Sequence, residues 1–134
     1  MSLPLTPVVG YVRAPTREDV QNLRADLDEY ASRARLLVRD VAREAPGASA
    51  AMLPAFAGCL EMVRKEIVRG ILLPTWVHLA PNGLLGMALF RAARRGGAPL
   101  YVADLTDIPR WAVEIAASAH QVQADMIATA GAPS

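Results

Sequence analysis

A run of apolar residues spaced three and four positions apart dominates the first third of this 134-residue chain. It extends over residues 16–45, with charged side chains on the opposite face. Such spacing places apolar side chains on one side of an α-helix, because the helix has 3.6 residues per turn. Thr16 is a suitable N-cap, with Asp19 three residues further on, and Pro46 ends the pattern. We predict one amphipathic helix of about 40 Å, at 1.5 Å per residue. Its predicted buried stripe consists of Val20, Leu23, Leu27, Tyr30, Ala34, Leu37, Val38 and Val41.

The first fifteen residues differ from the helical pattern that follows them. Pro4, Pro7 and Pro15 bias the backbone toward extended geometry, because proline has a fixed φ and no N–H to donate. We expect residues 1–15 to form an extended N-terminal arm, in which VVGYV could pair as a short edge strand.

Two further helices are predicted from apolar spacing and from residues that begin or end helices. One starts near Pro54, which a first helical turn tolerates, and stops at Gly70. The other follows Asp107 and ends at Gly131. The predicted stripes are Phe56, Leu60, Val63, Ile67 and Ile71 in the first, and Trp111, Ile115, Ala119, Val122 and Met126 in the second.

Cys59 is the single cysteine of the chain and lies next to the apolar stripe of the helix that starts near Pro54. One cysteine excludes an internal disulfide and is typical of a reducing compartment. No histidine is close to it in sequence, so we predict a buried structural thiol rather than a nucleophile.

A run of 20 residues without a charge, residues 71–90, allows three interpretations. It has the length of a membrane span, but Pro74 and Pro81 interrupt it, so a membrane location is not favoured. As a helix, residues 84–95 would be apolar almost all round and would need complete burial. As strands, GMALF would pair with PLYVA in a hairpin. We favour this hairpin, placed within residues 75–105.

Composition and charge indicate a protein that meets a partner. Hydrophobic residues make up 53% of the chain and charged residues 20%, so some apolar surface is expected in an interface. The net charge of +1 argues against a general binder of polyanions, and we expect no specific nucleic acid. Residues 62–95 carry six basic groups against one acidic group, and residues 96–134 carry one against four. These charges either solvate the surface or join unlike faces of neighbouring subunits. The candidate partner-contact residues are Arg91, Arg94, Arg95, Asp104 and Asp107.

Motifs of enzyme chemistry are missing from the sequence. It has no GxxxxGK phosphate loop, no GxSxG nucleophile elbow and no HExxH zinc motif. Its histidines, His78 and His120, have no cysteine pair nearby to complete a metal site. Asp104 and Asp107 could pair as carboxylates, but capping of a helix is the simpler role. We therefore predict no enzyme, no cofactor and no metal.

Four segments carry a likeness to a known family. They are ASRARLLVRDVAREAPG (31–47), PAFAGCLEMVRKEIVRG (54–70), APNG (80–83) and GAPLYVADLTDIPRW (97–111). Together they resemble the head–tail connector (adaptor) proteins of tailed bacteriophages, which have two helices, a turn with a small β element and a leucine–tyrosine stretch. The apolar LLGMALF and the long final helix depart from that family.

The resemblance implies a structural protein of the virion. It implies a ring of identical subunits with head-to-tail contacts, bound to a portal or neck component, with no cofactor. The fold class expected is mainly α, a small helical bundle built on the long amphipathic helix with a short β-hairpin insertion. One helical domain would span residues 16–134. The alternatives are a cytoplasmic helical regulatory or binding module that acts through an apolar surface at residues 71–90, and a peripheral membrane protein.

Overall fold

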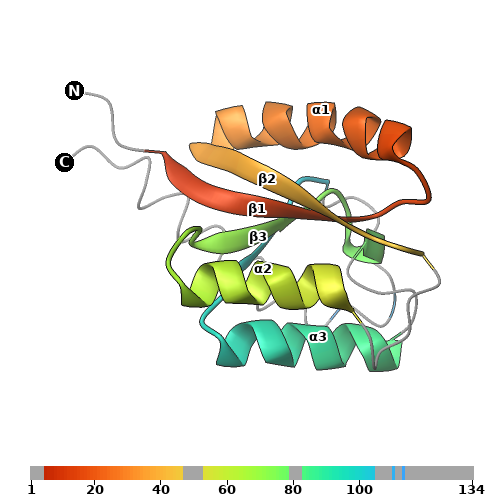
Figure 1. Ribbon diagram of the computed structural model, residues 1–134, viewed down its shortest axis with the longest axis vertical. Coiled ribbons are helices and arrows are strands. Elements are labelled where there is room, and N and C mark those ends of the chain that lie inside the picture. Colours follow the sequence, from red (N-terminus) through yellow and green to blue (C-terminus); the bar gives the residue numbers. More distant parts are fainter. Residues whose placement is uncertain (1–4, 47–52, 79–82, 105–109, 111–112, 114–134) are drawn as a thin grey trace.

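Four parallel strands in the order β2-β1-β3-β4 form the centre of the computed structural model (Figure 1). The structure describes residues 5–46, 53–78 and 83–104, together with residues 110 and 113. Helix α1 covers one face of the sheet, and α2 and α3 cover the other (Figure 1). The elements are β1 (Thr6–Arg13), α1 (Arg17–Ala34), β2 (Leu36–Glu44), α2 (Pro54–Arg64), β3 (Gly70–Leu73), the 3-10 helix η1 (Trp76–His78), α3 (Gly83–Arg95) and β4 (Leu100–Val102).

The fold is α/β, and the prediction of a mainly α bundle with a hairpin insertion is wrong. Strands and helices alternate along the chain, as they do when each helix connects two parallel strands across a face of the sheet. Every strand pair is parallel within the described residues, so they contain no hairpin.

Strand β1 lies in the middle of the sheet, between β2 and β3. Val8, Val9, Tyr11 and Val12 are all buried. A continuous apolar run of this kind is typical of a parallel strand that has helices on both faces. The strand expected at VVGYV therefore forms, but residues 6–13 belong to the centre of the sheet rather than to an arm or an edge.

The helix predicted over residues 16–45 is two elements, because α1 ends at Ala34. Arg35 takes a left-handed conformation with φ of 58°, and its N–H bonds to the carbonyl of Ala31, which closes the helix. Residues 36–44 then form β2, with Leu36 and Val38 buried and Leu37 exposed between them. Adjacent apolar residues fit both the helical and the strand period, so spacing alone could not separate the two.

Helix α2 begins at Pro54 as predicted but ends at Arg64 rather than near Gly70. Phe56 and Cys59 are buried against the sheet. Ile67, predicted in the buried stripe, is exposed, and Ile71 lies in β3. The predicted stripe therefore crosses from the helix into the next strand.

Cys59 is buried, as predicted. Burial raises the pKa of this thiol to about 12, and the charge of Glu44 adds to the effect. We expect the folded protein to react slowly with a thiol reagent such as an aromatic disulfide, and the urea-unfolded protein to react at once, since the thiolate is the reactive form. Stoichiometric labelling of the native protein within seconds would contradict this.

The uncharged run at residues 71–90 is divided among β3, η1 and the first half of α3. GMALF is helical, so the hairpin that we favoured there is wrong. Leu85, Leu89 and Ala93 on α3 face the core at four-residue steps. PLYVA contributes β4, which runs parallel to β3.

No helix in the described part of the chain has the length and apolarity that a bilayer crossing needs. The helix predicted between Asp107 and Gly131 lies outside the described residues, apart from residues 110 and 113.

Candidate functional site

The order of the strands selects one edge of the sheet as the place for a site. From β1 the chain passes through α1 to β2 on one side of the sheet, and from β3 it passes through α3 to β4 on the other side. The connections that follow β1 and β3 therefore diverge at the carboxyl ends of these strands. In open α/β sheets, ligands bind in the crevice at such a switch point.

A hydrogen bond joins the two connections at this edge. The backbone N–H of Arg13, at the end of β1, donates to Nδ1 of His78 at 3.0 Å. Since Nδ1 accepts, the proton of the neutral imidazole is on Nε2. Burial, followed by the nearby charge of Arg13, lowers the pKa of His78. The ring is therefore neutral at pH 7, with one N–H to donate.

We expect a nuclear magnetic resonance titration to place the pKa of His78 below 6.5, the usual value for histidine. Because the folded-state pKa is lowered, stability is complete above pH 6.5 and falls as the pH drops toward the folded pKa. His78→Asn keeps an acceptor for the N–H of Arg13 and removes the titration, so it should flatten that pH dependence. A pKa above 6.5, or an unchanged profile in His78→Asn, would contradict the assignment.

The first turn of α1 lies at the same edge, directly after β1. Thr16 is its N-cap: Oγ1 accepts from the backbone N–H of Asp19 at 3.2 Å and donates to Oδ2 of Asp19 at 2.8 Å. Thr16 is therefore the N-cap of α1, as predicted. The uncapped N–H groups and the helix dipole favour an anion at this end of α1.

Basic residues come from three elements at this edge. Nη1 of Arg43 donates to the backbone carbonyl of Ala14 at 3.1 Å, and Arg17 is exposed in the first turn. With Arg13, three basic side chains come from the ends of β1 and β2 and the beginning of α1, against Glu18 and Asp19. The edge therefore combines basic side chains, backbone donors, a hydroxyl and a neutral imidazole.

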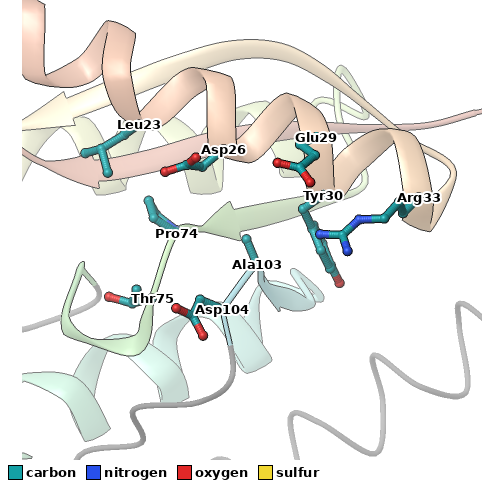
Figure 2. A pocket seen from close by; sticks show the side chains of 9 residues that line it. All are labelled: Leu23, Asp26, Glu29, Tyr30, Arg33, Pro74, Thr75, Ala103 and Asp104. Atoms are coloured by element: carbon teal, nitrogen blue, oxygen red, sulfur yellow. The ribbon is translucent and has the colours of Figure 1, made fainter.

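A cleft of about 560 Å³ lies beside this edge, between α1 and the carboxyl ends of β3 and β4 (Figure 2). Side chains from α1 extend over the segment that follows β3 and over the end of β4 (Figure 2). Three of its lining groups are carboxylates, and one is a guanidinium. The lining residues are Leu23, Asp26, Glu29, Tyr30, Arg33, Pro74, Thr75, Ala103 and Asp104.

The residues predicted to contact a partner lie at opposite edges of the sheet. Arg91, Arg94 and Arg95 are exposed in the second half of α3, which ends just before β4 begins. Asp104 follows β4 at the carboxyl edge and lines the cleft, and Asp107 lies outside the described residues. The fold therefore does not bring the arginines and Asp104 together within one chain.

Sequence reasoning missed most of the residues at the carboxyl edge. Arg13 was not singled out, His78 was considered only as a metal ligand, and Thr16 only as a cap. Arg13 and His78 are 65 positions apart and meet because β1 and β3 are parallel neighbours. Recognition of VVGYV as a central strand was the one signal that could have led to them.

No protein-family model matches the chain, and no curated protein matches it. Solved structures do. The C-terminal catalytic domain of ISC1926 TnpA, an IS607-like serine recombinase, has 18% identity and a TM-score of 0.61, over 84% of this chain and 76% of that chain. A resolvase family site-specific recombinase from Streptococcus pneumoniae has 12% identity and a TM-score of 0.57, over 92% and 91%. The C-terminal catalytic domain of IS1535 TnpA, also an IS607-like serine recombinase, has 22% identity and a TM-score of 0.53, over 94% and 100%.

The chain therefore has the fold of serine recombinase catalytic domains. The resemblance to phage head–tail connectors is wrong, and so are the structural role in a virion and the portal or neck partners. The helical binding module and the peripheral membrane protein do not fit this fold either. The prediction that the protein is not an enzyme is also wrong, since the similar structures are catalytic domains. One of the segments that carried this resemblance, residues 31–47, is not a single helix, because it contains the end of α1 and all of β2.

Proposed function

We propose that this chain acts on DNA in a recombination reaction, as an assembly of identical copies. The observation that carries the proposal is the carboxyl edge of the sheet, where the start of α1, Arg13 and the neutral His78 gather in a fold shared with recombinase catalytic domains. Backbone N–H groups and guanidinium groups are the donors that proteins use to hold the phosphates of DNA.

The nucleophile proposed is the hydroxyl of Thr16. Serine gives the similar recombinases their name, but within the described residues the one serine is Ser32, which is exposed in the last turn of α1 at the opposite edge. Oγ1 of Thr16 lies 2.8 Å from a carboxylate oxygen of Asp19, which is hydrogen-bond reach for a nucleophile and its base.

The reaction would transfer one phosphodiester linkage from DNA to protein. Oγ1 of Thr16 attacks phosphorus and gives its proton to Asp19. The bond from phosphorus to one deoxyribose oxygen breaks, and that oxygen leaves as a hydroxyl after it takes up a proton. The product is a threonine phosphodiester with one DNA strand end, which a second strand's hydroxyl can attack in reverse. The positive end of α1 stabilises the charge that develops on the phosphate.

Three variants of Thr16 separate chemistry from helix capping. Thr16→Ser keeps the hydroxyl and the cap, Thr16→Asn keeps a cap and has no hydroxyl, and Thr16→Ala has neither. We expect the wild type and Thr16→Ser to form a detergent-stable adduct with end-labelled duplex oligonucleotides of randomised sequence, and the other two to form none. Peptide mass spectrometry should place the adduct on Thr16.

Binding is measured on the same proteins by gel shift at several salt concentrations. Affinity that falls as salt rises indicates phosphate contacts, and Thr16→Asn should bind as the wild type does. An adduct in Thr16→Asn, or binding without any adduct in the wild type, would contradict the role of Thr16. Absence of DNA binding at low salt would contradict the proposed function as a whole.

A further inference from the structure

The cleft beside α1 has the wrong charge for DNA. Asp26, Glu29 and Asp104 supply three negative charges, and Arg33 supplies one positive charge, which leaves two negative charges in excess. Within the described residues, neither Asp26 nor Glu29 makes a salt bridge. A phosphate backbone would be repelled from this wall, so the cleft fits a cationic group and is distinct from the phosphate site proposed above.

The opposite face of the molecule carries the complementary charge. Helix α3 lies across the sheet from α1 (Figure 1). It has no acidic residue, and Arg91, Arg94 and Arg95 are all exposed on it at spacings of three and four residues. Such spacing places the three guanidinium groups on adjoining turns of one side of the helix.

We propose that the cleft of one copy receives the α3 arginines of a second copy. A single chain cannot make this contact, because the cleft and α3 lie on different faces of its sheet. The two surfaces are unlike, so the contact joins different faces of the two copies. It involves Arg91, Arg94, Arg95 and Asp104, which were predicted from the sequence to contact a partner.

The chemistry of the cleft suits arginine better than a bare cation. Its carboxylates can accept paired hydrogen bonds from the planar guanidinium. Pro74, Ala103 and the ring of Tyr30 provide apolar surface for the methylene groups of the side chain. The volume of about 560 Å³ is within the usual range of binding pockets, about 300–1,000 Å³.

Charge reversal on each surface tests the contact without DNA, so its outcome is independent of the proposed reaction. The cleft variant carries Asp26→Lys, Glu29→Lys and Asp104→Lys, and the α3 variant carries Arg91→Glu, Arg94→Glu and Arg95→Glu. Sedimentation velocity at low salt should show that the wild type associates. Each variant should have a dissociation constant raised by at least about tenfold. The matched controls Glu18→Lys and Arg69→Glu, exposed outside both surfaces, should associate as the wild type does.

Mixing the two variants gives the decisive result. The cleft variant keeps its arginines and the α3 variant keeps its cleft, so an equimolar mixture should form a 1:1 pair more tightly than either variant associates alone. Circular dichroism checks that both variants are folded. A monomeric wild type, a variant that associates as tightly as the wild type, or a mixture that forms no pair would each overturn the proposal.

Discussion

Replacement of Glu44 with alanine is expected to lower the free energy of unfolding by about 3–5 kcal/mol. This carboxylate is 2% exposed and accepts three hydrogen bonds. The donors are the hydroxyl of Tyr11 at 3.2 Å, the backbone N–H of Ala55 at 3.3 Å and that of Phe56 at 3.1 Å. Without the carboxylate, these donors stay buried and lose their acceptor, which costs more than the bonds themselves contribute.

Glu44 acts as the cap of α2 although it lies at the end of β2. Leu53, at the N-cap position, makes no side-chain hydrogen bond, and Pro54 has no N–H. The carboxylate therefore satisfies the first N–H groups of the helix from another element, near its positive end. Burial raises the pKa of Tyr11, despite the opposing charge of Arg13, so the phenol stays protonated as a donor.

Urea unfolding, followed by circular dichroism, measures the effect of the substitution. Glu44→Gln retains one carbonyl oxygen and should lose less stability than Glu44→Ala. The exposed neighbour Arg39 is the control, and Arg39→Ala should change stability by less than about 0.5 kcal/mol. A loss below about 1 kcal/mol for Glu44→Ala would mean that water or a rearranged α2 satisfies the donors instead.

Leu27→Ala and Leu37→Ala, which the helical pattern predicts to be equivalent, are expected to differ greatly. Leu27 is 0% exposed and packs against β1, where its Cδ1 lies 2.9 Å from the point that a Cβ on Gly10 would occupy. Its truncation should cost about 2–5 kcal/mol, from lost burial and the cavity that remains. Leu37 is 39% exposed on β2, and its truncation should cost less than about 0.5 kcal/mol.

Thermal or urea unfolding of the two variants decides between the helix and the strand in residues 36–44. Equal and large losses would indicate that both leucines are in the core, as on one face of a continuous helix. A small loss at Leu27 would indicate that α1 does not cover the sheet as described. The small loss expected at Leu37 follows from β2, because strand geometry turns adjacent side chains to opposite faces.

The local sequence determined where several elements begin and which groups are buried within them. Thr16 caps α1 through Asp19, and Pro54 begins α2, because caps and first-turn prolines act through neighbouring backbone groups. Cys59 lies on the buried side of α2, as the apolar spacing around it predicts.

Tertiary structure decided whether two ambiguous segments form a strand or a helix, and with them the fold class. Residues 36–44 contain adjacent apolar residues that fit the spacing of a helix as well as that of a strand. They form a strand because β1 supplies a parallel partner for their backbone N–H and carbonyl groups. Residues 83–95 carry no charge before Arg91 but form a helix, because the sheet buries Leu85 and Leu89. The fold class was misjudged at these two places.

The position of the candidate site also depends on the parallel pairing of the strands. Arg13, Thr16 and His78 come from connections that are distant in the chain, and they share one edge because the strands before them run in the same direction. The cleft likewise exists only where α1 overhangs the ends of β3 and β4. The spacing of residues in the sequence indicates only which side chains share a face of one helix or strand. Contacts across 65 positions require strand order and direction, which the cooperative burial of the whole sheet determines.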